Sequence, residues 1–271
     1  MKISNIVSRR NRILLRELVV TDFKLRYQGS VLGYLWSLLK PLMLFAIMYI
    51  VFVRFLRFGA GLEHFAVSFL LGIVLWSFFT EATSQGMQSI VARGDLIRKI
   101  NFPKYIIVIS GTLSALINLA FNLVVVFVFM VLDKVDFQWS ALLVPIHIVE
   151  LYIFALAIAF FLSAAYVKFR DLSHIWEVVL QGAFYATPIF YPLQMVIAYS
   201  LIAAQILMLN PIAVIVQNIR YDLVSQADTV TADQIISSPF WLLFPHLIVI
   251  ASIVLATWYF KKNQKYFAEN V

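Results

Sequence analysis

Three glutamates draw attention first, because Glu81, Glu150 and Glu177 lie within otherwise apolar stretches of the 271-residue sequence. An ionised carboxylate at the centre of a bilayer costs at least about 2.5 kcal/mol, so such a residue usually faces a cavity or a partner. One interpretation is that these groups carry protons during transport. The interpretation that we favour places Glu81 and Glu177 near the cytoplasmic boundary, and Glu150 against outer water or a neighbouring helix.

Metal and nucleotide sites have no matching pattern in the sequence. Its four histidines, at positions 64, 147, 174 and 246, fall in different predicted elements without a His-Glu-x-x-His spacing. The sequence has no cysteine, which excludes thiol catalysis, and no Gly-x-x-x-x-Gly-Lys-Ser/Thr motif, which excludes a P-loop. We therefore expect a chain without enzymatic activity, metal or cofactor. If transport is driven by ATP, the ATP and its magnesium bind to another polypeptide.

The connection at residues 85–104 mixes apolar and charged side chains at a spacing typical of a short amphipathic helix. We place this helix at about residues 87–103, where a proline ends it. Its charged residues are Arg93, Asp95, Arg98 and Lys99. Such a helix can rest on lipid or dock in the groove of a soluble partner. In the second case Leu96 and Ile97 are the expected apolar anchors, and Asp95 or Arg98 fixes the register by charge pairing.

These residues must be positioned by membrane-spanning helices. Hydrophobic residues make up 62% of the sequence and charged residues only 13%, whereas a soluble domain is about one quarter charged. Runs of about 20 apolar residues match a hydrocarbon layer about 30 Å thick, and backbone in lipid satisfies its hydrogen bonds internally as helices. We therefore predict an all-α polytopic membrane protein. Its six expected spans are residues 31–53, 65–83, 105–132, 141–167, 175–191 and 240–260.

The basic residues predict the orientation of these spans. Sixteen lysines and arginines fall before the first span, after the second and fourth spans, and in the C-terminal tail, but only four fall in the opposite connections. The positive-inside bias therefore places both termini in the cytoplasm and residues 221–239 outside. It also accounts for the net charge of +7 without a nucleic-acid partner.

The N-terminal segment, residues 1–30, is predicted to be an amphipathic helix at the cytoplasmic membrane interface, preceding a permease domain at residues 31–271. Its apolar residues recur at helical spacing among basic ones, unlike a secretory signal. Each basic side chain near anionic lipid head groups contributes about 1 kcal/mol. The alternative is a simple topology signal. The basic residues assigned to the interface are Arg9, Arg10, Arg12, Arg16, Lys24 and Arg26.

A break is required between the fifth and sixth spans. The mostly apolar stretch 175–209 would form a helix about 52 Å long, far more than one crossing needs. Pro188 and Pro192 interrupt it, and Asn210-Pro211 breaks the chain again directly after it. An additional crossing would place the basic tail outside, so we predict a re-entrant hairpin at about residues 192–219, with 193–209 dipping in and 212–219 returning.

The sequence resembles the permease subunits of type-2 ABC exporters, particularly those for lipid-linked O-antigen polysaccharide or teichoic acid. The matching motifs cover nearly the whole chain in family order. They are Asp22 to Trp36 leading through Pro41, Asp95 to Pro103, Phe169-Arg170-Asp171, Thr187 to Pro192, and Asn210-Pro211.

This resemblance implies a homodimer in the bacterial inner membrane, with a pore between the subunits, two copies of a separate ATPase, and a polyprenyl-linked glycan as substrate. It implies that residues 93–99 form the coupling helix, and that Arg170 and Asp171 make a second cytoplasmic contact. Because the sequence ends soon after the last span, a carbohydrate-recognition module is expected on a partner.

Aromatic side chains suit a sugar pore, because their faces contact sugar C–H groups without a fixed hydrogen-bond pattern. Phe45, Tyr49 and Phe52 share one predicted helix face, at i, i+4 and i+7. A second candidate group is Phe184, Tyr185, Phe190 and Tyr191. The alternative is that both groups serve packing or interfacial belts, since 15% of the residues are aromatic.

Three other functions remain open on sequence grounds. A permease of the same architecture could export a drug or a simple lipid. A membrane enzyme acting on polyprenyl-phosphate lipids would need charged catalytic groups gathered at one membrane face, whereas the acids and histidines here are scattered. An ATP-independent carrier would use the three intramembrane glutamates.

Overall fold

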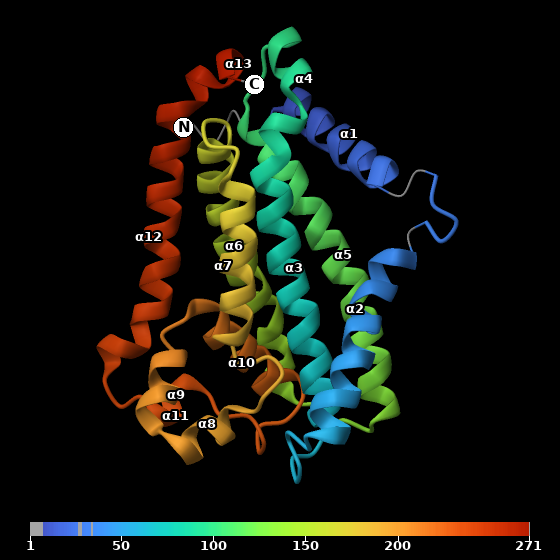
Figure 1. The fold of residues 1–271 in the computed structure, drawn as a ribbon, viewed down its shortest axis with the longest axis vertical. Helices are drawn as coiled ribbons and strands as arrows, with labels where there is room; N and C mark the ends of the chain where they lie inside the picture. The colour runs from blue at the N-terminus through green and yellow to red at the C-terminus, as the bar shows by residue number, and fades with distance from the viewer. Residues whose placement is uncertain (1–7, 27–28, 34, 271) are drawn as a thin grey trace.

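The computed structural model describes residues 8–26, 29–33 and 35–270, and over these residues it is helical and contains no strand (Figure 1). Arg26 is described by its backbone only, so its predicted side-chain role lies outside the described residues, as do residues 1–7 of the predicted interface segment. The prediction of an all-α polytopic membrane protein is confirmed, because five described helices are long and apolar enough to cross a membrane.

The five long helices form the body of the molecule. They are α2 (Leu35–Met48) continued by the π-helix η2 (Tyr49–Phe55), α3 (Phe65–Ala92), α5 (Tyr105–Leu132), the 3₁₀ turn η3 (Trp139–Leu143) with α6 (Val144–Tyr166), and α12 (Pro239–Asn263). The shorter helices are α1 (Arg9–Arg26), α4 (Gly94–Lys99), α7 (Leu172–Tyr185), α8 (Leu193–Tyr199), α9 (Leu201–Leu207), α10 (Pro211–Leu223), α11 (Ala232–Ile235), η4 (Gln264–Tyr266) and α13 (Phe267–Asn270).

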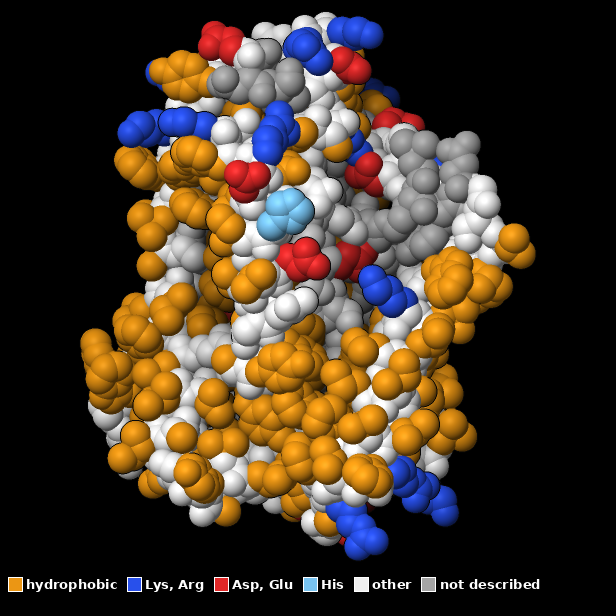
Figure 2. Space-filling model, viewed as in Figure 1, with side chains coloured by type: hydrophobic (Ala, Val, Ile, Leu, Met, Phe, Trp, Pro, Cys, Tyr) orange, Lys and Arg blue, Asp and Glu red, His pale blue; other side chains and the backbone are white. Residues whose placement is uncertain are grey.

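The short helices gather at the two ends of the bundle. Figure 1 shows α1, α4 and α13 at one end, which we call the basal end, and α8, α9 and α11 at the other, which we call the distal end. In Figure 2, lysines and arginines lie at both ends, apolar side chains cover most of the lower face, and a few charged side chains lie in a hollow midway. This distribution is that of a protein surrounded by hydrocarbon.

Helix α3 is the centre of the bundle and packs against α2, α5, α6, α7 and α10. It approaches α6 closely at Gly86, where a Cβ atom would lie 2.4 Å from Cβ of Ala159. Small residues permit such close helix contacts in membranes. By contrast, α2 buries only Pro41 and Phe45, and α7 buries none of its side chains.

The predicted fifth span, residues 175–191, is shorter in the structure. Helix α7 has 14 residues, or about 21 Å, and is followed by non-helical backbone up to Pro192. The reason is the pair of prolines in this segment, which removes two helical donors. A sixth candidate span exists only if α9 and α10, bent by 99°, count as one.

The segment predicted as a two-armed hairpin, residues 192–219, contains three helices, α8, α9 and α10. The side chain of Ser200 accepts a hydrogen bond from the backbone of Ala203 and so begins α9. Asn210 caps α10 in the same way through Ile212, with Pro211 at the first helical position. The break at Asn210 was predicted, but the break at Ser200, which divides the expected arm 193–209 into α8 and α9, was not.

Candidate translocation groove and coupling surface

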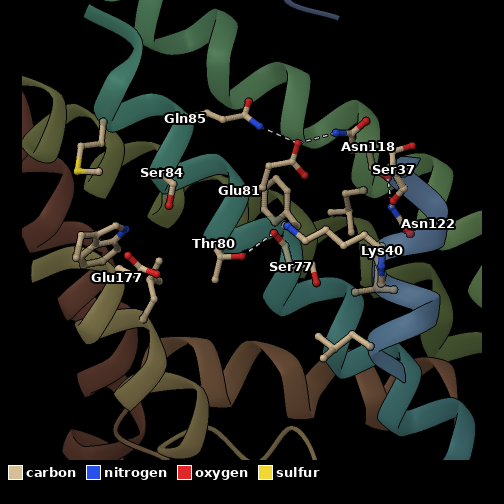
Figure 3. A pocket seen from close by; sticks show the side chains of 18 of the residues that line it. Ser37, Lys40, Ser77, Thr80, Glu81, Ser84, Gln85, Asn118, Asn122 and Glu177 are labelled. Atoms are coloured by element: carbon tan, nitrogen blue, oxygen red, sulfur yellow. Dashed lines mark hydrogen bonds between the residues drawn. The ribbon is translucent and has the colours of Figure 1, made fainter. Parts of the chain in front are cut away.

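A cavity of about 780 Å³ opens between α2, α3, α5 and α7. Figure 3 shows its walls: Lys40 extends from α2 across the cavity, Glu81 stands on α3, and Glu177 lies on the opposite wall, on α7. We call this cavity the groove. Polar and ionisable groups in an apolar helix bundle usually face such a space, and the groove therefore accounts for two of the three intramembrane glutamates.

Glu81 is held in a fixed position in the groove. Its Oε1 accepts hydrogen bonds from Nε2 of Gln85 at 2.9 Å and from Nδ2 of Asn118 at 2.6 Å. Glu81 lies inside the 28-residue α3, about 17 Å from the C-terminal end of that helix, on the wall of the groove. Its expected position near the cytoplasmic boundary of the membrane stays a prediction.

A second polar contact ties α5 to α2 beside the groove. The Nδ2 atom of Asn122 donates to the backbone oxygen of Ser37 at 3.2 Å and to that of Asn118 at 2.8 Å. Helices α2, α3 and α5 are therefore linked by hydrogen bonds inside the apolar bundle, where such bonds are worth about 1 kcal/mol each.

Glu150 lies outside the groove. It pairs with Nδ1 of His246, so α6 is joined to α12 at this point. This contact matches the expectation of a neighbouring helix as the partner of Glu150. The other histidines do not gather here, and over the described residues no three His, Asp or Glu side chains could hold a metal ion together.

The structure brings the two predicted aromatic groups together. The ring centroids of Phe52 and Phe190 are 4.8 Å apart, and that of Phe184 lies 5.6 Å from Phe190. Tyr185 and Tyr191 also contact Phe190, at 5.7 and 4.9 Å. We call these five residues the aromatic cluster. The groove lining ends at Leu44 on α2 and Leu180 on α7, so the cluster lies beyond its distal end.

The first predicted pore residue, Phe45, has a different position. It is buried against Phe69 of α3, at 5.7 Å, and Phe129 of α5, at 6.0 Å. Tyr49 remains partly exposed and stacks with the guanidinium of Arg54 at 5.8 Å. Within one subunit, therefore, Phe45 packs the core, whereas Tyr49 and Phe52 lie nearer the surface.

The helix predicted at about residues 87–103 is shorter in the structure: residues up to Ala92 belong to α3, α4 covers only Gly94–Lys99 at the basal end, and residues 100–103 before the helix α5 are not helical. Asp95, Arg98 and Lys99 are exposed on α4, with Arg98 donating to Asp95 at 3.2 Å. Leu96 is partly buried, but Ile97 is only 4% exposed because it packs in a basal apolar cluster with Leu18 and other residues. The exposed apolar residue of this surface is Ile100, at 46%.

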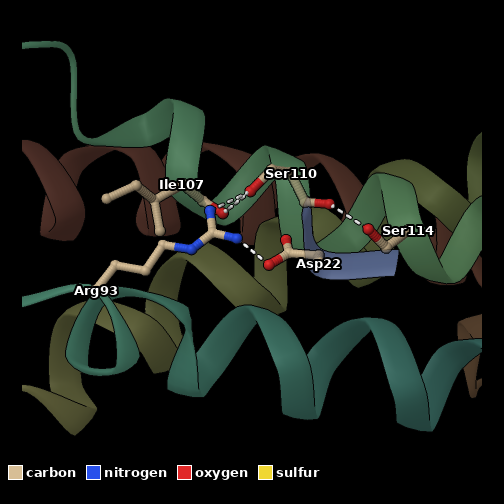
Figure 4. Close-up of polar contacts among 5 residues, drawn as sticks. All are labelled: Asp22, Arg93, Ile107, Ser110 and Ser114. Atoms are coloured by element: carbon tan, nitrogen blue, oxygen red, sulfur yellow. Dashed lines mark hydrogen bonds and ion pairs between the residues drawn. The ribbon is translucent and has the colours of Figure 1, made fainter. Parts of the chain in front are cut away.

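The Arg93 side chain is held by contacts within the subunit (Figure 4). Its guanidinium donates to Oγ of Ser110 on α5 at 3.0 Å and forms an ion pair with Asp22 on α1. Ser110 in turn donates to the backbone oxygen of Ile107. Arg93, at the junction of α3 and α4, thus links α1 and α5 to this junction.

Comparison with known proteins settles the family. The family model described as ABC-2 type transporter matches residues 13–224. The chain belongs to the ABC-2 type transporter family. It is 32% identical over 182 residues to the O-antigen export system permease protein RfbA of Myxococcus xanthus, covering 67% of this chain and 69% of that protein. It is 28% identical over 197 residues to RfbA of Klebsiella pneumoniae, covering 69% and 74%.

The ABC-2 match confirms the resemblance to type-2 ABC permeases. A further motif of that resemblance contains Arg170 and Asp171. Arg170 and Asp171 lie in the connection from α6 to α7, with Asp171 exposed and Arg170 over the ring of Tyr166 at 5.6 Å. Asp171 directly precedes α7, where a negative charge stabilises the helix N-terminus. The connection is at the same end of the bundle as α4 (Figure 1).

The segment predicted to lie at the membrane interface forms α1, which packs along α5. Arg9, Arg12 and Arg16 line a second cavity, of about 870 Å³, together with apolar residues of α1 and Leu113 of α5. Arg10 and Lys24 are exposed. The basic residues are therefore spread around an exposed surface of α1, as a helix in a lipid head-group layer requires.

One residue that sequence reasoning missed is Arg220 on α10, which the charge count placed in an outer connection. It is 4% exposed, and its guanidinium donates to the backbone oxygens of Ser68 at 2.9 Å and Ile189 at 2.6 Å, and to that of Pro188. It thereby satisfies carbonyls that the break after α7 leaves without helical partners. In the sequence, only the helix-breaking prolines Pro188 and Pro192 indicated that backbone carbonyls here would lack helical partners.

Proposed function

We propose that this protein is the permease subunit of an ABC exporter that moves a lipid-linked O-antigen polysaccharide out of the cytoplasm across the bacterial inner membrane. The observation that carries the proposal is the polar groove of about 780 Å³ within the apolar bundle of an ABC-2 family chain. Relatives in two organisms, each covered over more than two thirds of its length, are named O-antigen export permeases.

The groove becomes a channel when two copies of the chain meet. Helices α2 and α7 flank it and bury almost nothing within the subunit. Exposed apolar residues here include Ile47 on α2, Ile50 on its continuation η2, and Val178 on α7. Contact between two copies along these helices would cover both faces and enclose the groove, with Tyr49 and the aromatic cluster at its distal end as apolar contacts for sugar rings.

Energy comes from two copies of a separate ATPase, which carry the ATP and magnesium, so this subunit has no enzymatic activity or cofactor of its own. The ATPase docks on α4 through Asp95, Arg98, Lys99 and Ile100, and makes a second contact at Arg170 and Asp171. In this arrangement both termini lie in the cytoplasm, α1 rests among membrane lipids, and α8 to α11 face outward.

The test is depletion of the protein in its host, followed by detection of the glycan. We expect O-antigen to disappear from the surface and lipid-linked polysaccharide to accumulate inside. In inverted vesicles, uptake of the glycan should require both ATP and the co-purifying ATPase. Uptake driven by a proton gradient without ATP would indicate a secondary carrier, and normal surface O-antigen with failure to export a drug or simple lipid would indicate a different cargo.

A further inference from the structure

Polar side chains of α3 recur at helical spacing along the wall of the groove. Six of the α3 residues that line the cavity are polar, at i, i+3, i+4, i+7, i+8 and i+11: Ser77, Thr80, Glu81, Ser84, Gln85 and Gln88. We call them the polar stripe. It extends for about 17 Å along a helix that otherwise has the most buried span of the bundle. Packing alone would favour apolar or small residues at these positions.

We propose that the polar stripe is a binding track for the hydroxyl groups of the glycan, with Glu81 as its central acceptor; this inference rests on the proposed function. A sugar hydroxyl donates one hydrogen bond and accepts others. The stripe offers the complementary groups: hydroxyls from serine and threonine, amides from glutamine, and one carboxylate.

Glu81 is preorganised for this role. Two amide donors, one from the next turn of α3 and one from α5, bind the same oxygen of its carboxylate. The carboxylate therefore keeps its orientation in the groove before a ligand arrives, and no side-chain entropy is lost on binding. Hydrogen bonds to an ionised group are about twice as strong as neutral ones, so Glu81 is the strongest single acceptor on the stripe.

Asn118 supplies a second indication of a polar ligand. It is 3% exposed, and while its Nδ2 holds Glu81, its Oδ1 has no hydrogen-bond partner. A buried carbonyl without a partner costs about 1–3 kcal/mol. A hydroxyl that reaches this oxygen from the groove would recover that free energy.

The walls beside the stripe fit a sugar chain as well. Trp36 on α2 and Trp176 on α7 line the groove, and the indole of Trp176 is fixed by donating to Oγ1 of Thr83 at 3.2 Å. Aromatic faces flanking polar groups suit sugar rings, which are apolar on their faces and polar at their edges. Lys40, which extends into the same space, adds a donor (Figure 3).

The experiment uses the complete complex of permease and ATPase and, as probe, O-chain released from the host's lipopolysaccharide by mild acid. Glu81→Gln keeps the size of the side chain and removes the charge. We expect it to raise the O-chain concentration for half-maximal stimulation of ATP hydrolysis by about tenfold or more, from the loss of a charge-assisted hydrogen bond. Export should fall in parallel, while assembly with the ATPase stays unchanged.

Glu150→Gln is the matched control, because it makes the same chemical change in an apolar helix outside the groove. If Glu81→Gln fails to assemble, the double variant Ser84→Ala/Gln88→Ala tests the same stripe with neutral residues, and we expect a shift of about threefold.

Wild-type half-maximal concentrations in an assembled stripe variant would overturn the track while leaving the proposed function intact. Loss of export by Glu81→Gln with an unchanged half-maximal O-chain concentration would also overturn the binding track, because Glu81 would then act in a later step. Absence of any O-chain effect or export in the wild type would instead refute the proposed function, and the track with it.

Discussion

At the scale of single residues, the buried guanidinium of Arg220 depends on a missing side chain elsewhere. A Cβ atom at Gly72 of α3 would lie 2.3 Å from Nη2 of Arg220. The guanidinium cannot move aside without losing its carbonyl partners at Pro188 and Ile189. Position 72 must therefore be glycine to leave room for the Arg220 guanidinium. The guanidinium, in turn, connects the non-helical segment after α7 to α3.

We therefore predict that Gly72→Ala and Arg220→Gln each destabilise the folded subunit by about 3 kcal/mol, because buried carbonyls lose their donors. Thermal unfolding of the purified protein in detergent measures the effect. Gly182→Ala on α7 is the matched control, since a Cβ atom there meets nothing within 4 Å, and it should leave the melting temperature unchanged or raise it. Equal melting temperatures of all three variants would contradict this role of Gly72 and Arg220.

Sequence reasoning could not have found this pair. Arg220 hydrogen-bonds to Ser68, 152 residues away, and its position beside acidic residues looked like an exposed connection. By contrast, the intramembrane position of Glu81 was readable from its apolar surroundings, although its amide partners were not. Residue types show which groups need partners, but only the packing of distant helices decides which partners they find.

At the scale of elements, the link from α1 to the α3–α4 junction is the ion pair of Asp22 and Arg93. Both side chains are partly buried, so in the proposed coupling mechanism, in which the ATPase displaces α4, the two helices should move as one. We predict that Asp22→Asn lowers export by about tenfold, equivalent to about 1.4 kcal/mol, while the bound ATPase still hydrolyses ATP. The charge-swapped variant Asp22→Arg/Arg93→Asp should recover part of the loss.

Lys24→Gln, at an exposed position of α1 two residues after Asp22, serves as the control for this prediction. Export and hydrolysis measured on the same vesicles report the coupling. Normal export by Asp22→Asn would show that the two helices need no such link.

At α4, buried residues can be distinguished from the exposed residues that we propose bind the ATPase. Ile97→Ser should destabilise the basal end by about 2–4 kcal/mol, because it places a polar group and a void in a buried cluster. Ile100→Ser should change stability little, since that side chain is already 46% exposed, but it should weaken co-purification of the ATPase. The reverse pattern, with Ile97 controlling binding alone, would place the docking surface on the other side of α4.

The bounds of the elements were predicted best where hydropathy was uniform. The third span was expected at 105–132 and α5 has those bounds, but the second was expected to end at residue 83 and α3 continues to Ala92. The difference arises because the polar stripe interrupts the apolar run without interrupting the helix. Polar residues that face a groove look, in sequence, like the end of a span.

At the scale of the whole molecule, topology is the first property to test. The proposed orientation places residues 221–239 on the outer side of the membrane and the C-terminal tail on the cytoplasmic side. We predict that Ala227→Cys, at an exposed position of this otherwise cysteine-free chain, reacts with a membrane-impermeant maleimide added to intact spheroplasts. Lys262→Cys should react only after the membrane is opened. Labelling of the two sites in the opposite order would invert the assignment of basal and distal ends.

The contact of Gly86 with Ala159 has a mechanical consequence. Helices packed at such short range cannot slide or separate without disrupting the core. We therefore expect α3, α5 and α6 to move as one rigid unit. Helices α2 and α7 bury so little that they can swing away from it at small internal cost. In the proposed dimer, the resistance to widening the passage for a bulky polymer therefore lies in the surrounding lipid and in the contact between copies, on which the proposed ATPase would act.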